Sequence, residues 1–366
     1  MTRNSQGTVD PLDFTEVLER QKSPGFKLTF IVPTDVNGST ESALMTLRNQ
    51  LREAKRVLLE HDHTEAKAEA CLAPVAALAD DSAYWRQRSR SVVIFLADEF
   101  FQAMRVPIEL GNSLTIDEHF NLLPLAPVIA SDRKLYVLAL ARNSVRLFET
   151  SRNVIEELPL ENIPKSFDDV IGEIPVRNID VRAGTGGVGR TASFQGQDRD
   201  IDRQVLEQYI RAIGQALGQR LGTARSQMLV LASVAEYLPY FKESSSYPAV
   251  FDGVIAGNSD RALPDDLRSA AWQLVEGHEA ARDAQELDQA HSLVHAGKGE
   301  LDLAEIARAA EAGRVDTLFL PRNDATIADP QLHALANRAL IGTLENSGTV
   351  RTLGTMEGSA LATFRY

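Results

Sequence analysis

The glycine-rich stretch at 184–197, GTGGVGRTASFQGQ, holds the residue types and spacing most suited to chemistry in this sequence. Its glycines match the dinucleotide-binding fingerprint, and GTGGVGRT matches a phosphate-binding P-loop except that Arg190 replaces the lysine. Both motifs require the loop to close directly onto a helix, whose first N–H groups hold the phosphates. Here residues 192–197 intervene before helical periodicity begins near Asp200. The pattern therefore does not predict a nucleotide site.

Two other interpretations of this stretch remain open. It is either a plain surface connection, in which glycines provide mobility, or a loop that a partner recognises. The stretch is longer than the usual connection of about 4–6 residues. Its end carries Phe194 and two glutamines between glycines, which is unusual for a linker. These features favour a functional loop.

Other reactive residue types form weaker patterns. His291 and His295 are one helical turn apart but lack an obvious third ligand, and the alternate residues of His61-Asp62-His63 would point apart on a helix. The single cysteine, Cys71, lies among alanines and leucines, which predicts a buried, inert thiol and excludes an internal disulfide. No G-x-S-x-G motif is present. We expect no metal site and no cofactor.

Length and composition limit the class of protein. The 366 residues allow about two to three domains, and 44% hydrophobic with 24% charged residues is ordinary for a soluble globular chain. A net charge of −13 repels nucleic acid at long range, which argues against a protein that coats DNA or RNA. A local basic patch is still compatible, because Arg177, Arg182 and Arg190 lie in or beside the loop. The chain has no secretory signal and no apolar run of about 18 residues, so we expect a cytoplasmic protein without a membrane partner.

Three segments must position the loop. In the first, 1–130, we expect a central sheet with helices: helices at 13–21, about 40–58 and 64–78, and strands at 26–33, 91–98 and 100–110, the last two forming a hairpin. The second, 131–224, begins with a hairpin at 134–150 and a strand after residue 153. The loop follows, and then a helix from about Asp200 whose apolar stripe is Val205, Tyr209, Ile210, Ile213, Leu217 and Leu221.

The third segment, 225–366, alternates strands with helices and predicts a three-layer α/β domain. Strands are expected at 227–234, 315–321, 349–355 and 360–366, and helices at 236–242, within 265–295, at 302–312 and at 330–345. Gly313 is placed to end the third of these helices.

The stretch LLPLAPVIASDRKLYVLALARNSVRLFE at 122–149 resembles the signature of the bacterial relatives of archaeal and eukaryotic class 1 release factors and Pelota, the baeRF families. FIVPTD at 30–35, GTGG at 184–187, VDTLFLPR at 315–322 and the closing GSALATFRY are also similar to that group. The resemblance covers nearly the whole chain. It implies an N-terminal α/β domain at 1–130, an RNase H-like middle domain at 131–224 that carries the loop, and a ribosomal-protein-like α/β/α domain at 225–366.

In class 1 release factors, a Gly-Gly-Gln loop of the middle domain enters the ribosomal peptidyl-transferase centre and positions water against the peptidyl-tRNA ester. The matching position here is Gln195-Gly196-Gln197, in which Gln195 stands where the first glycine should be. The Asn-Ile-Lys-Ser tetrapeptide that reads stop codons does not occur. The resemblance therefore implies a translation-linked factor that binds the ribosome or tRNA without reading stop codons. Its partner-facing residues would be Gly186, Gly187, Arg190, Gln195, Gly196 and Gln197, with basic support from Arg177 and Arg182.

Two alternatives stay open. One is a peptidyl-tRNA ester hydrolase in which Gln197 orients water or stabilises developing charge. The other is a stress-linked protein-interaction scaffold that makes no RNA contact.

Overall fold

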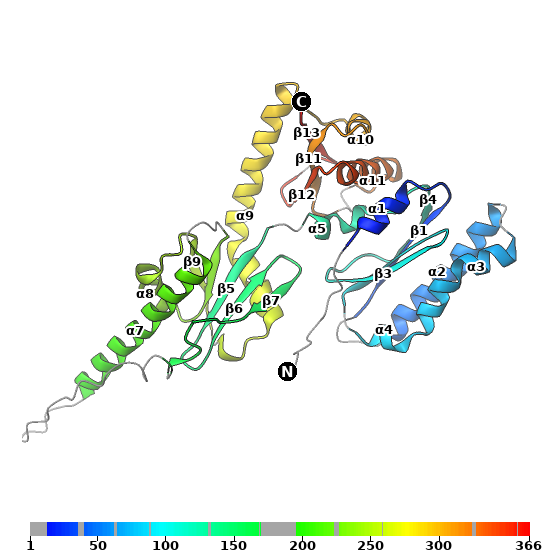
Figure 1. Ribbon diagram of the computed structural model, residues 1–366. Helices are drawn as coiled ribbons and strands as arrows, with labels where there is room; N and C mark the ends of the chain where they lie inside the picture. The colour runs from blue at the N-terminus through cyan, green and yellow to red at the C-terminus, as the bar shows by residue number, and fades with distance from the viewer. Residues whose placement is uncertain are drawn as a thin grey trace, which may run out of the picture. The chain divides into compact units, whose positions relative to one another are not determined.

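The computed structural model describes residues 13–35, 40–61, 64–87, 89–130, 133–167, 169, 195–222, 227–257, 259–323, 327–356 and 358–366, with side chains of the long helix from residue 204 onward. It is a mixed α/β protein with three sheets (Figure 1). The chain divides into two compact units. The first combines Met1–Ala130 with Ala280–Tyr366, and the second is Ser131–Glu279.

The N-terminal sheet of the first unit is antiparallel, with strand order β3-β2-β1-β4. Its strands are β1 (Lys27–Pro33), β2 (Ser91–Ala97), β3 (Phe100–Val106) and β4 (Ser113–Asp117). The helices are α1 (Thr15–Gln21), α2 (Glu41–Glu60), α3 (Glu65–Asp80) and α4 (Ser82–Arg86). The predicted β2–β3 hairpin and the three longer helices are confirmed, whereas β4 was not predicted. Strand β1 is buried on both faces because Phe30 packs towards α2 and α3 while Ile31 packs into a second core.

The C-terminal sheet of the same unit has the order β10-β13-β11-β12. Its elements are β10 (Gly299–Glu300), β11 (Val315–Pro321), β12 (Thr349–Leu353), β13 (Leu361–Phe364), α10 (Leu303–Glu311) and α11 (Pro330–Glu345). Helix α10 begins where the Asp302 carboxylate accepts hydrogen bonds from two N–H groups at 3.0 Å each. It ends before Gly313, whose φ of 70° confirms the predicted C-terminal glycine.

One hydrophobic core joins the two sheets of the first unit. Val93 and Phe95 of β2 belong to the same buried cluster as Leu318 and Leu320 of β11. The chain enters this core through a 3₁₀ turn (Leu123–Leu125) and the short helix α5 (Ala126–Ile129). At its centre the buried Asn337 of α11 accepts hydrogen bonds from the N–H groups of residues 122 and 123 at 2.8 and 3.1 Å. Its amide nitrogen donates to the Phe120 carbonyl at 2.8 Å.

The hydrogen bonds of Asn337 predict a large loss of stability on substitution. Asn337→Ala leaves two buried N–H donors and one carbonyl without their partner, so we expect the free energy of unfolding to fall by about 3 kcal/mol. Asn49→Ala, on the exposed face of α2, is the matched control and should cost less than about 0.5 kcal/mol. Urea unfolding of both variants measures the difference. Equal stability of the two variants would contradict this role for Asn337.

The crossing of α10 and α11 gives a second prediction. A methyl group on Gly342 would lie 2.8 Å from backbone atoms of Ala310 and Glu311, which cannot move aside cheaply. Gly342→Ala should therefore destabilise the protein by about 2 kcal/mol or more. Gly277→Ala, on an exposed helix position with nothing within 4 Å, should stabilise by about 0.5–1 kcal/mol. Thermal unfolding with opposite signs for the two variants would support the close crossing, and a neutral Gly342→Ala would exclude it.

The sheet of the second unit has the order β7-β6-β5-β8-β9. Its strands are β5 (Leu135–Leu140), β6 (Val145–Thr150), β7 (Ile155–Leu158), β8 (Leu229–Ala232) and β9 (Val250–Ile255). Strands β5, β6 and β7 are antiparallel, as the hairpin pattern predicted, whereas β8 and β9 run parallel to β5 and to each other.

Two features of this sheet differ from the sequence-based expectation. The strand expected at 227–234, which we had assigned to the third segment, pairs with β5 in the middle sheet. Parallel partners are separated by a crossover helix, so their pairing leaves no local turn signal in the sequence. Strand β9 was not predicted, because only part of its surface is buried and Gly253 interrupts its pattern.

Helices cover both faces of this sheet. The helices α7 (Gln195–Leu221) and α8 (Tyr237–Ser244) share one core with it, and α9 (Pro264–His295) packs on the other face through Leu267, Ala271, Trp272 and Val275. From Ala280 onward the residues of α9 belong to the first unit. Helix α7 begins at Gln195 rather than near Asp200, which corrects the predicted start. The apolar stripe begins only at Val205, so periodicity could not mark the polar first turns.

Candidate functional site

The predicted partner-facing residues fall into two groups. Gly186, Gly187, Arg190, Arg177 and Arg182 lie outside the described residues, so their role stays a prediction. Gln195, Gly196 and Gln197 form the backbone of the first turn of α7. The glycine–glutamine element is therefore helical, and not the end of a loop as the sequence suggested.

Helix α7 is anchored by its C-terminal part. Among its side chains from residue 204 onward, Tyr209 is the first that is fully buried, and Ile210, Ile213, Leu217 and Leu221 follow it into the core. At a rise of about 1.5 Å per residue, the backbone of Gln197 lies about 18 Å along the helix axis from that of Tyr209. The described backbone thus separates Gln195–Gln197 from Tyr209 by about three helical turns.

Close packing fixes the direction of this helix. Methyl groups on Gly214 and Gly218 would collide with Ser244 and Ser246, at the end of α8. The two glycines therefore lie in close contact with the end of α8 and the two residues after it. Sequence periodicity identified the apolar stripe of α7, but it gave no signal for this second contact.

Tyr209 ties α7 to the end of β5. Its hydroxyl donates a hydrogen bond to the Ala141 carbonyl at 2.7 Å, and its ring meets that of Phe167 edge-on with centroids 5.4 Å apart. The guanidinium of Arg142 lies over the other ring of this pair, 4.5 Å from the Phe167 centroid. Burial is the main cause that raises the pKa of Tyr209 above its ordinary value of 10.0.

The raised pKa of Tyr209 predicts a pH dependence of stability. The folded state keeps the phenol protonated where the unfolded chain releases its proton, so the stabilisation is complete below pH 10 and is lost as the pH rises further. Tyr209→Phe removes one hydrogen bond and should cost about 1 kcal/mol at pH 7. Its deficit relative to wild type should shrink above pH 10. Urea unfolding at pH 7 and at alkaline pH measures this, and a deficit that does not change with pH would refute the assignment.

The carboxyl ends of the parallel strands bring several polar residues together. Arg142, Asn143 and Ser144 follow β5, and Asp260 lies in the 3₁₀ turn (Ser259–Arg261) that follows β9. The Asp260 carboxylate accepts from the Ser144 hydroxyl at 2.5 Å and from the Asn143 amide at 3.4 Å. Open α/β sheets bind their ligands along this edge. The sequence gives no signal that these residues lie together, because they come from segments far apart in the chain.

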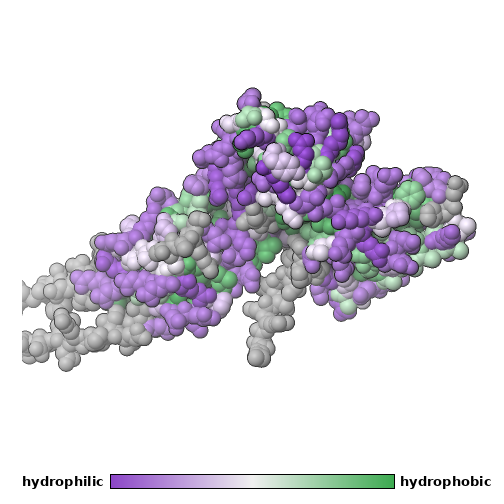
Figure 2. All heavy atoms as spheres, turned by 45° about the horizontal axis from the view of Figure 1, so that its top comes forward, coloured by the Kyte–Doolittle hydropathy of each residue, from purple (hydrophilic) through white to green (hydrophobic). Residues whose placement is uncertain are grey.

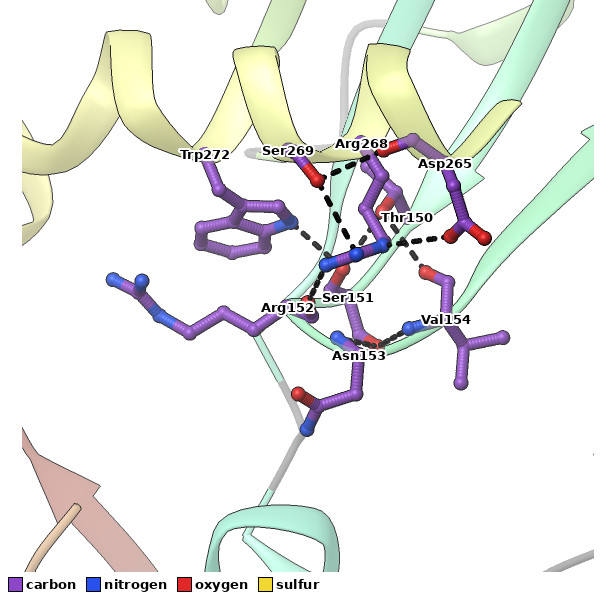
Figure 3. Close-up of polar contacts among 9 residues, drawn as sticks. All are labelled: Thr150, Ser151, Arg152, Asn153, Val154, Asp265, Arg268, Ser269 and Trp272. Carbon is purple, nitrogen blue, oxygen red and sulfur yellow. Dashed lines mark hydrogen bonds and ion pairs between the residues drawn. The ribbon is translucent and has the colours of Figure 1, made fainter. Parts of the chain in front are cut away.

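At the amino end of β5 the β6–β7 turn is fixed to α9 (Figure 3). The Trp272 indole nitrogen donates to the Ser151 carbonyl at 2.7 Å, and Arg268 donates to the Arg152 carbonyl. The Arg152 guanidinium in turn lies 4.7 Å from the Trp272 ring centroid. These contacts hold backbone carbonyls and an aromatic ring, so we assign this cluster a structural role.

Among the described residues, the weaker sequence candidates are not grouped into a metal-binding cluster. In the described part of the chain no group of three His, Cys, Asp or Glu side chains is arranged to hold a metal ion, the pair His291 and His295 included. The residues after His61 in the predicted His-Asp-His pattern lie outside the described ranges. Cys71 is half-buried, and burial, with a smaller effect of Asp98, raises the pKa of its thiol, which lowers its reactivity. None of the helices in the described ranges is long and apolar enough to cross a membrane.

Comparison with known proteins gives a family match for the segment that contains helix α7 and the sheet of the second unit. Residues 134–314 match the family model described as "Bacterial archaeo-eukaryotic release factor family 3". Residues 134–314 therefore belong to this family. The matched segment contains the sheet of the second unit, helix α7 and the polar edge after β5 and β9. A comparison with curated proteins gives no match.

Solved structures similar to this chain include a release factor and Pelota proteins. An archaeal translation termination factor, aRF1, is 12% identical with a TM-score of 0.23, covering 96% of this chain and 97% of its own. A chain of a model of ribosome-bound archaeal Pelota and ABCE1 is 11% identical with a TM-score of 0.34, covering 98% and 95%. Dom34 of S. cerevisiae is 13% identical with a TM-score of 0.35, covering 73% and 72%. These superpositions are loose, so the family assignment rests on the match over 134–314.

Proposed function

We propose that this baeRF protein is a cytoplasmic translation factor that binds the ribosome or tRNA in a rescue, hibernation or stress role, without reading stop codons. Its family membership supports a translation-linked role. The observation that carries the proposal is helix α7, whose first turn holds Gln195–Gln197 about 18 Å along the helix axis from Tyr209, the first fully buried side chain from residue 204 onward. Such a helix delivers its first turn into a pocket of a large partner while the sheet stays outside.

We also propose the three-domain architecture of the release-factor group. The three separate sheets support it, with an N-terminal domain at 1–130, an RNase H-like middle domain and a ribosomal-protein-like α/β/α domain at the C-terminus. The mixed five-stranded sheet with helices on both faces supports the middle assignment. This domain extends past residue 224 in our proposal, so that it includes β8 and β9.

The hydrolase alternative ranks lower. Two adjacent glycines would let the backbone adopt conformations with φ > 0 in a tight pocket, but Gln195 occupies the first of these positions. The element is also helical from Gln195 onward, so its backbone differs from a glycine turn. We therefore propose that Gln197 contacts the partner and does not activate water.

Ribosome binding tests the proposal. Purified protein is sedimented with bacterial ribosomes at near-physiological salt, because low salt would exaggerate electrostatic contacts. Gln197→Ala should weaken binding at least fivefold, whereas Gln215→Ala, an exposed glutamine on the anchored part of the same helix, should bind like wild type. A proline at Gly196 would be a poor test, because proline is tolerated in the first turn of a helix.

Each alternative function predicts a different result. Release of labelled peptide from ribosomal peptidyl-tRNA, abolished by Gln197→Ala, would restore the hydrolase. Failure of the wild-type protein to bind ribosomes, with and without added tRNA, would reject the proposed function and favour the scaffold without RNA contact.

A further inference from the structure

Apart from Arg152, which stacks on Trp272, the described basic side chains of the second unit separate into two groups. One group forms ion pairs with carboxylates: Arg133, Lys134, Arg146, Arg211, Lys242 and Arg268. In the other group, Arg142, Lys165, Arg220 and Arg261 have no ion-pair partner within the described ranges of this unit. Arg220 lies near the end of α7, apart from the other three. Those three lie on the loops at the carboxyl edge of the sheet.

Backbone contacts bring these three residues to one place. The Phe167 N–H donates to the Arg142 carbonyl at 2.9 Å, and the Val145 N–H donates to the Lys165 carbonyl at 2.8 Å, so 165–167 runs alongside the β5–β6 turn. Arg261 follows Asp260, which the Ser144 hydroxyl ties to the same turn. All three basic side chains are exposed. We call Arg142, Lys165 and Arg261 the sheet-edge patch.

The orientation of the Arg142 guanidinium is restrained in a way that suits an anionic ligand. Its guanidinium is stacked on the buried Phe167 ring, and this ring packs against the Tyr209 side chain of α7. Stacking restrains the plane of the guanidinium and leaves its N–H groups directed outward within that plane. A restrained guanidinium loses less conformational entropy when it binds a phosphate through two hydrogen bonds.

Three carboxylates lie at this edge: Glu236, which follows β8, and Asp169 and Asp260, which accept hydrogen bonds within the edge. The Asp169 carboxylate accepts from the backbone N–H groups of Lys165 and Ser166 at 2.9 and 3.1 Å. Asp260 accepts from Ser144 and Asn143, as described above. Their negative charge weakens the attraction for a single small anion. Cations on three separate loops match a chain of phosphates better, because each contact adds its own counterion release.

The surrounding surface favours a polar partner. Figure 2 shows that hydrophilic residues cover most of the visible face, with apolar residues in small separate areas. Near the sheet edge the large exposed apolar side chains include Val234 and Leu263, which are 48% and 58% exposed. Two isolated side chains do not form the continuous apolar core of a protein–protein interface.

We propose that the sheet-edge patch binds the phosphate backbone of RNA. This contact lies beside Tyr209 of α7, and in the proposed function the first turn of the same helix makes the other contact with the partner. This inference rests on the proposed function, because it names the chemistry by which the ribosome or tRNA is held. It also explains how a chain with a net charge of −13 makes an RNA contact: three positive charges without an ion-pair partner in the described part of the second unit lie together at one edge.

The test compares variants with the same change in net charge. The patch variant carries Arg142→Gln, Lys165→Gln and Arg261→Gln, and the control carries Lys134→Gln, Arg211→Gln and Lys242→Gln, whose charges are paired with carboxylates. Binding to bacterial ribosomes and to a fluorescein-labelled RNA hairpin is measured across a salt series. The patch variant should bind at least fivefold more weakly, and its salt slope should fall by about 2 for three lost phosphates. The control should keep the wild-type slope.

Other outcomes separate this proposal from the proposed function. A patch variant that binds like wild type, while Gln197→Ala loses ribosome binding, overturns the patch and leaves the function standing. Equal losses in patch and control variants also overturn it, because net charge alone then explains binding. Hairpin binding that the patch variant loses, without ribosome binding by wild type, supports the patch and rejects the function. The double variant Lys165→Gln/Arg261→Gln keeps the Arg142 side chain stacked on Phe167, so it controls for misfolding caused by loss of that stack. Its loss of RNA binding should be smaller than that of the patch variant.

Discussion

The buried amide of Asn337 is the contact on which the arrangement of the first unit depends. It binds backbone groups 215 residues away in the sequence and so closes the two ends of the chain into one core. Ordering so long a connection costs conformational entropy that no local contact offsets. The shared apolar cluster and the satisfied amide together offset it, and the intervening Ser131–Glu279 forms a compact unit with its own two cores.

Within that second unit, the anchoring of α7 determines what its first turn can do. Tyr209 holds the helix to the end of β5, and two glycines let α8 pack closely along it. The opposite face of the sheet is covered by α9, which the Trp272 and Arg268 contacts fix to the β6–β7 turn. The sheet of the second unit is thus packed between helices on both faces. Three cations of the described second unit that have no ion-pair partner, Arg142, Lys165 and Arg261, lie at the edge of the sheet to which Tyr209 is hydrogen-bonded.

Local patterns predicted much of the fold. The β2–β3 and β5–β6 hairpins, the strand Val315–Pro321 and the helix Pro330–Glu345 all follow from alternation, apolar spacing and turn residues. The pairing of β8 with β5 and the existence of β9 did not, because parallel partners have no connecting turn. For the candidate site, the sequence indicated the glycine–glutamine element. It gave no signal for the helical start at Gln195, since the first turns of α7 are polar.

The amino-acid sequence by itself determined the class of the protein: a mixed α/β chain of acidic net charge with a release-factor-like glycine–glutamine element. These properties reside in composition and in short segments, where each residue acts through its neighbours. Only the tertiary structure decided that both ends of the chain share one core and that Arg142, Lys165 and Arg261 meet at one edge. Such juxtapositions depend on contacts between distant segments, whose free energy is gained only when the whole chain is folded.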